Sequence, residues 1–175
     1  MEEIPGFCEE IVFRPIGVIR TPYKDWAPHQ PVEREPEEEG KFRLVVFDDF
    51  AEGLKDVERF SHIYVLSFLD RAAQGPAPLF ASPPWADGKQ VGLFASRSPF
   101  RPNPIGLSIV RLIRIEGNEV LTSPIDVFDG TPLLDIKPYF RQVDAKLDAN
   151  SGWAEDLNDS DHKFHHLRGL SHDHG

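Results

Sequence analysis

Residues 105–123 read IGLSIVRLIRIEGNEVLTS, and this stretch indicates the fold more clearly than any other part of the chain. Ile105 to Ile115 alternates apolar with other side chains, as a β-strand does. Its apolar members include Leu107, Ile109, Leu112, Ile113 and Ile115. Gly117-Asn118 is a two-residue hairpin signal, and Val120 to Ser123 is the returning strand. The stretch therefore predicts a β-hairpin.

Short extended segments separated by turn residues fill much of the remaining chain. Further strands are predicted over 11–20, 41–47, 62–69, 91–96, 125–128 and 133–137. One short helix is expected over 50–59, where Phe50, Leu54 and Val57 share a face and Asp48 or Asp49 can cap it. This pattern predicts a mainly β chain, a small antiparallel β-barrel with one short helix and peripheral loops.

Length and composition indicate one globular domain with a tail. At 175 residues and 40% apolar content the chain can bury a full core. We expect an N-terminal segment over 1–10, the barrel domain over 11–144, and a His-rich acidic tail over 145–175 that is partly disordered or bound to a partner. The acidic start is unlike a signal peptide and no long apolar run occurs, so we expect a cytoplasmic protein without membrane contact.

The net charge of −10 argues against broad, non-specific binding of nucleic acid, but the charge is unevenly distributed. Between Ala86 and Arg114 the chain carries one acid, Asp87, and five bases. The bases are Lys89, Arg97, Arg101, Arg111 and Arg114. A local basic face can steer a polyanion despite an unfavourable total charge.

The loop 94–106, FASRSPFRPNPIG, lies within this basic stretch. Its prolines restrict the backbone before a ligand binds. Arg97 and Arg101 can therefore bind an anionic or planar ligand with little loss of conformational entropy. The alternative is a proline-rich turn whose arginines lie in solvent. A second loop, Asp129-Gly130-Thr131-Pro132, is a strong turn signal whose backbone and side-chain polar groups can read an adenine or ribose edge. Its alternative is an ordinary hairpin turn.

Several common sites are absent from the sequence. No Gly-x-Gly, Walker A or Gly-x-Ser-x-Gly pattern occurs, which excludes a Rossmann dinucleotide loop and a nucleophile elbow. Cys8 is the sole cysteine, so there is no intrachain disulfide and no thiolate metal cluster. His162 and His166 have a chelating i,i+4 spacing, but no neighbouring cysteine or carboxylate pattern completes a tetrahedral site, and we predict no metal.

Five segments together resemble the TsaA-like (YaeB-type) family of S-adenosylmethionine-dependent tRNA methyltransferases. They are IGVIRTPYK at 16–24, PHQP at 28–31, RSPFRPNPIG at 97–106, DGTP at 129–132 and DIKPY at 135–139. The resemblance covers about 11–140, some three quarters of the chain. It implies a small β-barrel that methylates N6 of threonylcarbamoyladenosine immediately 3′ of the tRNA anticodon, and it implies a homodimer. Longer bacterial members continue into a further C-terminal domain, and the acidic run 33–39 also departs from the family pattern.

The resemblance also implies which residues bind the methyl donor. They are Pro28, His29 and Gln30, then Asp70 and Arg71, then Arg97 and Leu107, and lastly Asp129, Gly130, Thr131 and Pro132. Arg97 would pair with the methionine carboxylate, while Leu107 and Pro132 would cover the adenine.

Candidate bases for the target amine are Asp135 and Asp129. Candidates for holding the anticodon loop are Arg101, Asn103, Lys137 and Tyr139. Two other functions compete with methyl transfer: a non-catalytic S-adenosylmethionine sensor, and a metal-dependent enzyme that uses the tail histidines.

Overall fold

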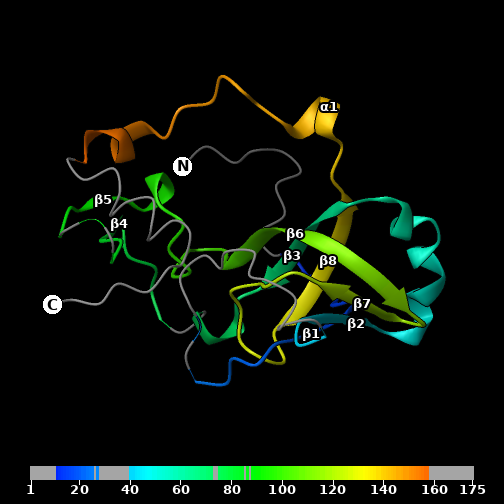
Figure 1. Cartoon of the computed structure of the whole chain (residues 1–175). Helices are drawn as coiled ribbons and strands as arrows, with labels where there is room; N and C mark the ends of the chain where they lie inside the picture. The colour runs from blue at the N-terminus through cyan, green and yellow to red at the C-terminus, as the bar shows by residue number, and fades with distance from the viewer. Residues whose placement is uncertain are drawn as a thin grey trace, which may run out of the picture.

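The computed structural model describes residues 11–25, 27, 40–72, 75–84, 86 and 88–157. Six antiparallel strands close into a barrel in the order β1-β2-β7-β6-β3-β8, with β8 paired to β1 (Figure 1). The strands are β1 Gly17–Arg20, β2 Arg43–Val46, β3 His62–Phe68, β6 Ile105–Glu116, β7 Glu119–Thr122 and β8 Pro132–Pro138. The predicted mainly β class is confirmed.

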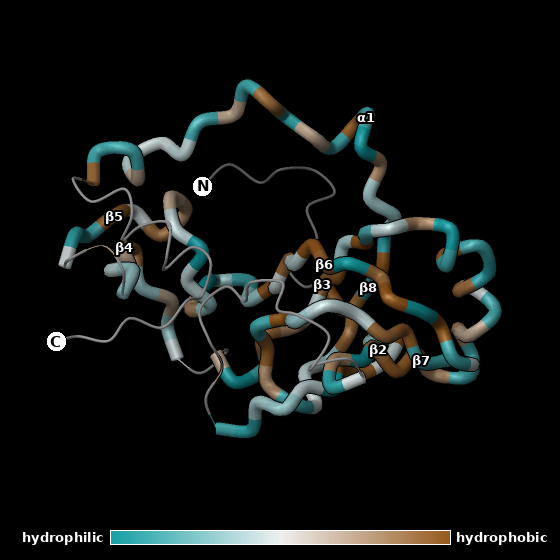
Figure 2. The backbone as a smooth tube through the Cα atoms, in the orientation of Figure 1, coloured by the Kyte–Doolittle hydropathy of each residue, from teal (hydrophilic) through white to brown (hydrophobic). Residues whose placement is uncertain are grey.

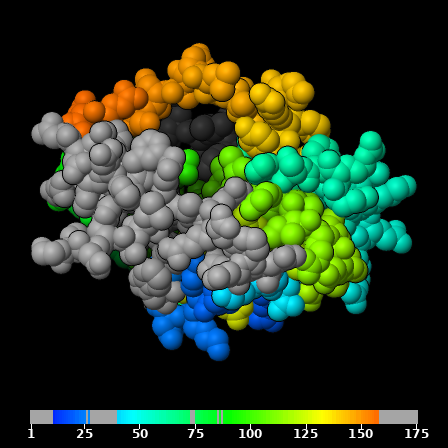
Figure 3. Space-filling model, viewed as in Figure 1, coloured from blue at the N-terminus to red at the C-terminus, as the bar shows by residue number. Residues whose placement is uncertain are grey.

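A second sheet of two short strands lies apart from the barrel (Figure 1). It pairs β4 Phe80–Ala81 with β5 Val91–Gly92, and we call residues 79–95 the lobe. The helices of the described residues are short: α1 Arg141–Asp144 and the 3-10 helices η2 Asp48–Leu54, η3 Val57–Arg59, η4 Asp70–Ala72, η5 Leu93–Ala95 and η6 Gly152–Asp156. Between α1 and η6 the chain forms a band along one edge of the molecule (Figure 3).

The core lies inside the barrel, where inward-facing residues of neighbouring strands meet. On β3, Ile63, Val65 and Ser67 are buried and the residues between them are not, which is the period-2 pattern of a half-buried strand. Phe42, directly before β2, is completely buried and is one of the largest side chains in the core. Apolar and polar stretches alternate along the barrel strands in Figure 2.

The predicted hairpin of 105–123 is confirmed, because β6 pairs with β7 across Gly117 and Asn118. The residues that β6 buries differ from those that simple alternation in the sequence would predict. Val110 and Leu112 point inward, whereas Leu107 and Ile109 lie on the outer surface and are 62% and 55% exposed. A register shift between Leu112 and Arg114 then turns Ile115 toward the core. One such irregularity exchanges the two faces of a strand, which alternation in the sequence does not reveal.

Three predicted strands are shorter than expected or absent. The strand predicted over 11–20 begins only at Gly17, and that over 91–96 ends at Gly92, where η5 follows. Residues 125–128 are not a strand, although Ile125 and Val127 are buried in the core. Apolar content alone therefore predicted burial correctly here, but not ladder pairing.

The single helix predicted over 50–59 is also wrong. The segment forms η2 and η3, separated at Asp56, whose φ is +67°. Neither acidic residue caps η2 through its side chain, and Asp48 instead accepts a hydrogen bond from Asn118 Nδ2 at 3.3 Å. Gly53 within the segment disfavours a continuous helix, while burial of Leu54 holds the shorter turns against the barrel.

Candidate functional site

Loops from distant parts of the sequence meet at one end of the barrel. β1 and β3 end there, and β6 and β8 begin there, because each pair of neighbours is antiparallel. Val18 is opposite Pro132, and Phe68 is opposite Ile105. The loops that follow β1 and β3 and those that precede β6 and β8 therefore lie around a common rim.

The turn 129–132 is fixed to the loop after β1. Asp129 N–H donates to Tyr23 O at 2.7 Å, and Gly130, with φ of +84°, donates to Ile19 O at 2.9 Å. The Asp129 carboxylate accepts from Thr21 N–H at 3.2 Å and lies 3.5 Å from Arg20 Nη1. Both carboxylate oxygens thus have partners that hold the turn.

Arg71 connects three of the loops at this rim. Its guanidinium donates to Lys24 O and lies 4.4 Å from the centroid of the Phe128 ring. Asp70 begins the same short helix, η4. The predicted segments 70–71 and 129–132 are therefore brought close together by the loop after β1. Pro28, His29 and Gln30 lie outside the described residues.

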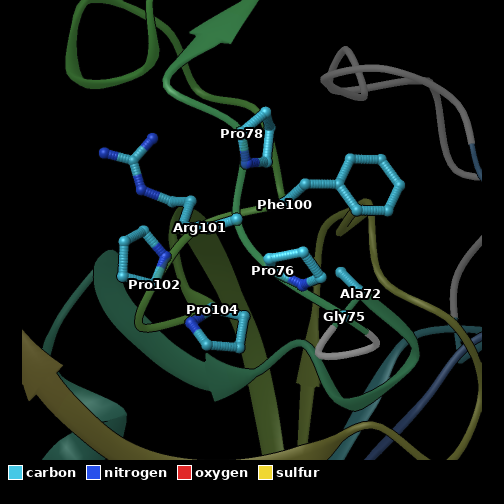
Figure 4. A pocket seen from close by; sticks show the side chains of 9 residues that line it. Ala72, Gly75, Pro76, Pro78, Phe100, Arg101, Pro102 and Pro104 are labelled. Atoms are coloured by element: carbon cyan, nitrogen blue, oxygen red, sulfur yellow. The ribbon is translucent and has the colours of Figure 1, made fainter.

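A pocket of about 440 Å³ lies beside η4 (Figure 4). Its walls come from the connection after η4 and from the proline-rich loop, and they consist of Ala72, Gly75, Pro76, Ala77, Pro78, Phe100, Arg101, Pro102 and Pro104. Leu69 N–H donates to Pro104 O at 2.7 Å and holds the two walls together. The volume lies within the usual range for small-molecule sites, and the Phe100 and proline rings offer flat apolar surfaces.

The two arginines of the proline-rich loop have different surroundings. Arg97 is exposed and, within the part of the chain that the structure describes, it forms no ion pair. Arg101 donates to Ser96 O at 2.9 Å and to Leu93 O at 3.4 Å, and its guanidinium lies 5.7 Å from the centroid of the Phe94 ring. The guanidinium of Arg101, predicted to contact RNA, is thus already bonded to its own loop. Asn103 in the same loop is exposed.

The remaining predicted residues lie on the outer wall formed by β6, β3 and β8. Leu107 is opposite Leu66, and Leu66 is opposite Asp135. Two strand spacings separate Leu107 from Asp135, or about 10 Å. Asp135 Oδ2 lies 2.7 Å from Lys137 Nζ, and Asp135 Oδ1 accepts from Ile136 N–H at 2.9 Å.

Tyr139 extends this wall at the end of β8. Its ring centroid lies 5.5 Å from that of Tyr64 and 6.3 Å from that of His62. Desolvation raises the pKa of Tyr64, and the negative charge of Asp144 raises it further. The structure therefore divides the predicted residues between the rim of the barrel and its outer wall.

Among the described residues no group of three or more histidine, cysteine or acidic side chains could hold a metal ion. His162 and His166 lie outside those residues. A search of the described helices for a membrane-crossing segment also finds none of sufficient length and apolarity. Phe100, which forms a pocket wall, has no role that its sequence context alone predicts, although it lies between Pro99 and Arg101 in the loop that carries the predicted arginines.

Comparison with known proteins identifies a family model that covers most of the described chain. The model of the tRNA-methyltransferase O N-terminal domain matches residues 18–145. A probable S-adenosyl-L-methionine-binding protein of Archaeoglobus fulgidus is 41% identical over 155 residues, which are 85% of this chain and 39% of the relative. A protein of Pyrococcus abyssi with the same description is 40% identical, over 83% of this chain and 77% of the relative.

Enzymes and solved structures are also similar. The tRNA (adenine(37)-N6)-methyltransferase of Escherichia coli is 35% identical over 82% of this chain and 63% of the relative. The crystal structure of TrmO from Pseudomonas aeruginosa has 34% identity and a TM-score of 0.65, and it covers 82% of this chain and 62% of that one. The chain thus spans less than two thirds of these two proteins and of the Archaeoglobus relative.

Proposed function

Because the chain belongs to the tRNA-methyltransferase O N-terminal domain family, we propose that it transfers a methyl group from S-adenosylmethionine to N6 of a tRNA adenine. The observation that carries the proposal is the meeting of segments 70–71 and 129–132 at one rim, beside a pocket of suitable size. The names of the curated relatives agree with both the donor and the reaction.

The residues present suit the donor. Its methionine carboxylate needs a cation, and Arg97 is an exposed guanidinium three residues before Phe100. Its adenosyl group needs flat apolar contacts, which Phe100 and the proline rings of the pocket provide. The rim turn 129–132 adds backbone groups that can hydrogen-bond a purine edge, since its own geometry is already held by Thr21 and Tyr23.

S-adenosylmethionine, when bound, supplies an electrophilic methyl group on sulfur. The chain's task is then to orient the target amine and to exclude water. Asp135 is the better of the two candidate bases, because it lies on the outer wall and its partners, Ile136 and Lys137, are neighbours on β8, whereas Asp129 ties the rim turn to the loop after β1. In the proposed step Asp135 takes the proton that N6 loses as it gains the methyl group, and Lys137 Nζ, 2.7 Å from Asp135 Oδ2, orients that carboxylate.

We further propose threonylcarbamoyladenosine next to the anticodon as the target. Lys137 is largely exposed and can contact phosphate, and Tyr139 offers a ring for a splayed base. Asn103 lies exposed in the loop that borders the pocket. Together these groups would hold an anticodon loop across the wall that carries Asp135, in a cytoplasmic protein.

A homodimer is part of the same proposal. Ile105, Leu107 and Ile109 form an apolar strip on the outer face of β6. Contiguous apolar side chains on a surface commonly mark a contact between subunits. A second copy over this strip would shield the wall next to Leu107 from water. Sedimentation equilibrium of wild type and of Ile109→Lys tests the contact: a monomeric wild type contradicts it.

The function is tested with tritiated S-adenosylmethionine and total tRNA from a strain without its own enzyme. Label in tRNA supports methyl transfer, whereas tight donor binding by calorimetry without label indicates the sensor instead. Arg97→Ala should lose donor binding. Arg114→Ala is the matched control, because Arg114 pairs with Glu116 at the far end of the barrel, and it should bind as wild type does. Absence of donor binding by wild type would overturn the proposal.

A further inference from the structure

The segment after the barrel returns to the lobe and binds it through one tryptophan. The Trp153 indole N–H donates to Ala95 O at 2.7 Å. Lys89 Nζ lies 3.4 Å from Trp153 O, 3.6 Å from Asp156 Oδ2 and 5.4 Å from the centroid of the Trp153 ring. Figure 1 shows η6 beside β5, at the end of the band that leaves α1. The contact joins residues 58 positions apart.

Residues 150–156 have their own local order. Ser151 N–H donates to Glu155 Oε1 at 2.7 Å, and Gly152 N–H donates to Asn150 Oδ1 at 3.2 Å. Ala154 is buried although most of its neighbours are exposed. A turn that is ordered before it docks can present the indole at a defined angle. These residues also lie beyond the match of the family model, which ends at 145.

The turn 93–96 is also held by its own loop. Leu93 O accepts from Ser96 Oγ at 2.8 Å and from Arg101 Nη1 at 3.4 Å, and Ser96 O accepts from Arg101 Nη1 at 2.9 Å. With Ala95 O bound to Trp153, three carbonyls of the turn have side-chain donors. The directions of these three carbonyls are therefore set, and the next residue in the chain is Arg97.

We propose that Trp153 and Arg101 are positioning residues that hold the turn 93–96 and thereby aim Arg97 at the anionic group of its ligand. The inference rests on the proposed function, in which that group is the donor carboxylate. A flexible arginine loses conformational entropy when it binds, and a backbone fixed beforehand lowers that cost. Trp153 supplies this order from outside the pocket, and Arg101, which also lines the pocket, supplies it through its bonds to Leu93 O and Ser96 O. Arg101 thus serves the donor site through its loop.

Hydrogen exchange tests the ordering without any ligand. Trp153→Phe keeps an aromatic ring and removes the N–H donor to Ala95 O. The amides of Ser96 and Ser98 should exchange several-fold faster in this variant, while barrel amides such as that of Val65 remain unchanged. Asp156→Asn is the matched control, because it removes an exposed ion pair and leaves the indole bond in place. Unchanged exchange at Ser96 and Ser98 in Trp153→Phe would overturn the inference.

A double-mutant cycle tests whether the effect passes through Arg97. Loss of one hydrogen bond should weaken binding of S-adenosylmethionine roughly 2- to 10-fold in Trp153→Phe, measured by calorimetry. In an Arg97→Lys background, which keeps a positive charge so that donor binding stays measurable, the same change should cost less than 2-fold. An equal loss in both backgrounds would mean that Trp153 supports the protein generally, and would refute the positioning role.

The positioning role of Trp153 and the proposed function can be contradicted separately. If wild type binds the donor and Trp153→Phe binds it equally well, the inference fails and the proposed function stands. If wild type does not bind the donor, the proposed function fails, and so does the claim that Arg97 is oriented toward the donor carboxylate. The exchange comparison then still decides whether Trp153 orders the turn. Arg101→Gln, with Arg114→Gln as control, repeats the exchange test at the bonds to Leu93 O and Ser96 O.

Discussion

Gly106 lies where the proline-rich loop enters β6, and it allows two strands to approach closely. A Cβ at this position would come closer than 3.0 Å to Ser67 Oγ and to 3.1 Å from Leu69 Cδ2. Ser67 is 1% exposed, so the hydroxyl has little room to retreat. We therefore predict that Gly106→Ala destabilises the barrel at the end that carries the candidate site.

The size of the expected stability loss follows from the overlap between the added Cβ and Ser67 Oγ. The hydroxyl oxygen would have to move on the order of 1 Å to reach ordinary contact distance. Overpacking of this size costs about 1–3 kcal/mol, and the loss of glycine freedom in the unfolded chain offsets about 0.4–1 kcal/mol of that. We expect a net loss of about 1–2 kcal/mol in the free energy of unfolding. For a chain of this size, the melting temperature should fall by about 3–6 °C.

Urea unfolding followed by circular dichroism measures the change, and two further variants make it specific. Gly53→Ala is the matched control, because no atom lies within 4 Å of its added Cβ, and it should leave stability unchanged or slightly raised. Ser67→Ala removes the clashing atom, so Gly106→Ala should cost less than about 0.5 kcal/mol in that background. A full-length Gly106→Ala as stable as wild type, or a loss that persists in the Ser67→Ala background, would refute the reasoning.

Three further changes probe the rim and the outer wall. Thr21→Val removes a buried hydroxyl that donates to Val127 O at 2.9 Å, and unpairing that carbonyl should lower the free energy of unfolding by about 1–3 kcal/mol in urea titrations. Arg71→Lys removes the guanidinium that lies over the Phe128 ring and should lower the free energy of unfolding by about 0.5–1 kcal/mol in the same assay. A stability equal to wild type would mean that this cation–π contact is unimportant. Because desolvation and then Asp144 raise the pKa of Tyr64 above its unfolded value near 10, the unfolded chain releases that proton first as pH rises. Wild type should therefore lose stability above about pH 10 more steeply than Tyr64→Phe, and parallel curves would contradict the assigned shift.

Local signals in the sequence were sufficient for several features. Gly117-Asn118 between two apolar runs predicted the β6–β7 hairpin, and Asp129-Gly130 predicted the turn at the rim. Both depend on the φ preferences of a few adjacent residues, and these act wherever the chain is placed. The combined motifs were also enough to identify the family, which the match to residues 18–145 confirms.

Other features depend on contacts between distant residues and needed the tertiary structure. The pairing of β1 with β8 closes the barrel across more than a hundred residues, and it brings Thr21 to the Asp129 carboxylate. The register shift in β6 decides that Ile115 packs against the core, whereas Leu107, before the shift, faces outward. The surroundings of a guanidinium are likewise set by what folds against it: Arg101 bonds its own loop, while Arg97, four residues earlier, remains exposed.

The sequence by itself thus determined the mainly β class, the hairpin and rim turns, and the family, since residue-specific backbone preferences and motif order are properties of the chain. Only the tertiary structure decided which face of each strand is buried and which polar groups remain available for ligands. Burial and hydrogen-bond partners arise when segments such as 93–101 and 150–156 meet, and no local pattern encodes that meeting.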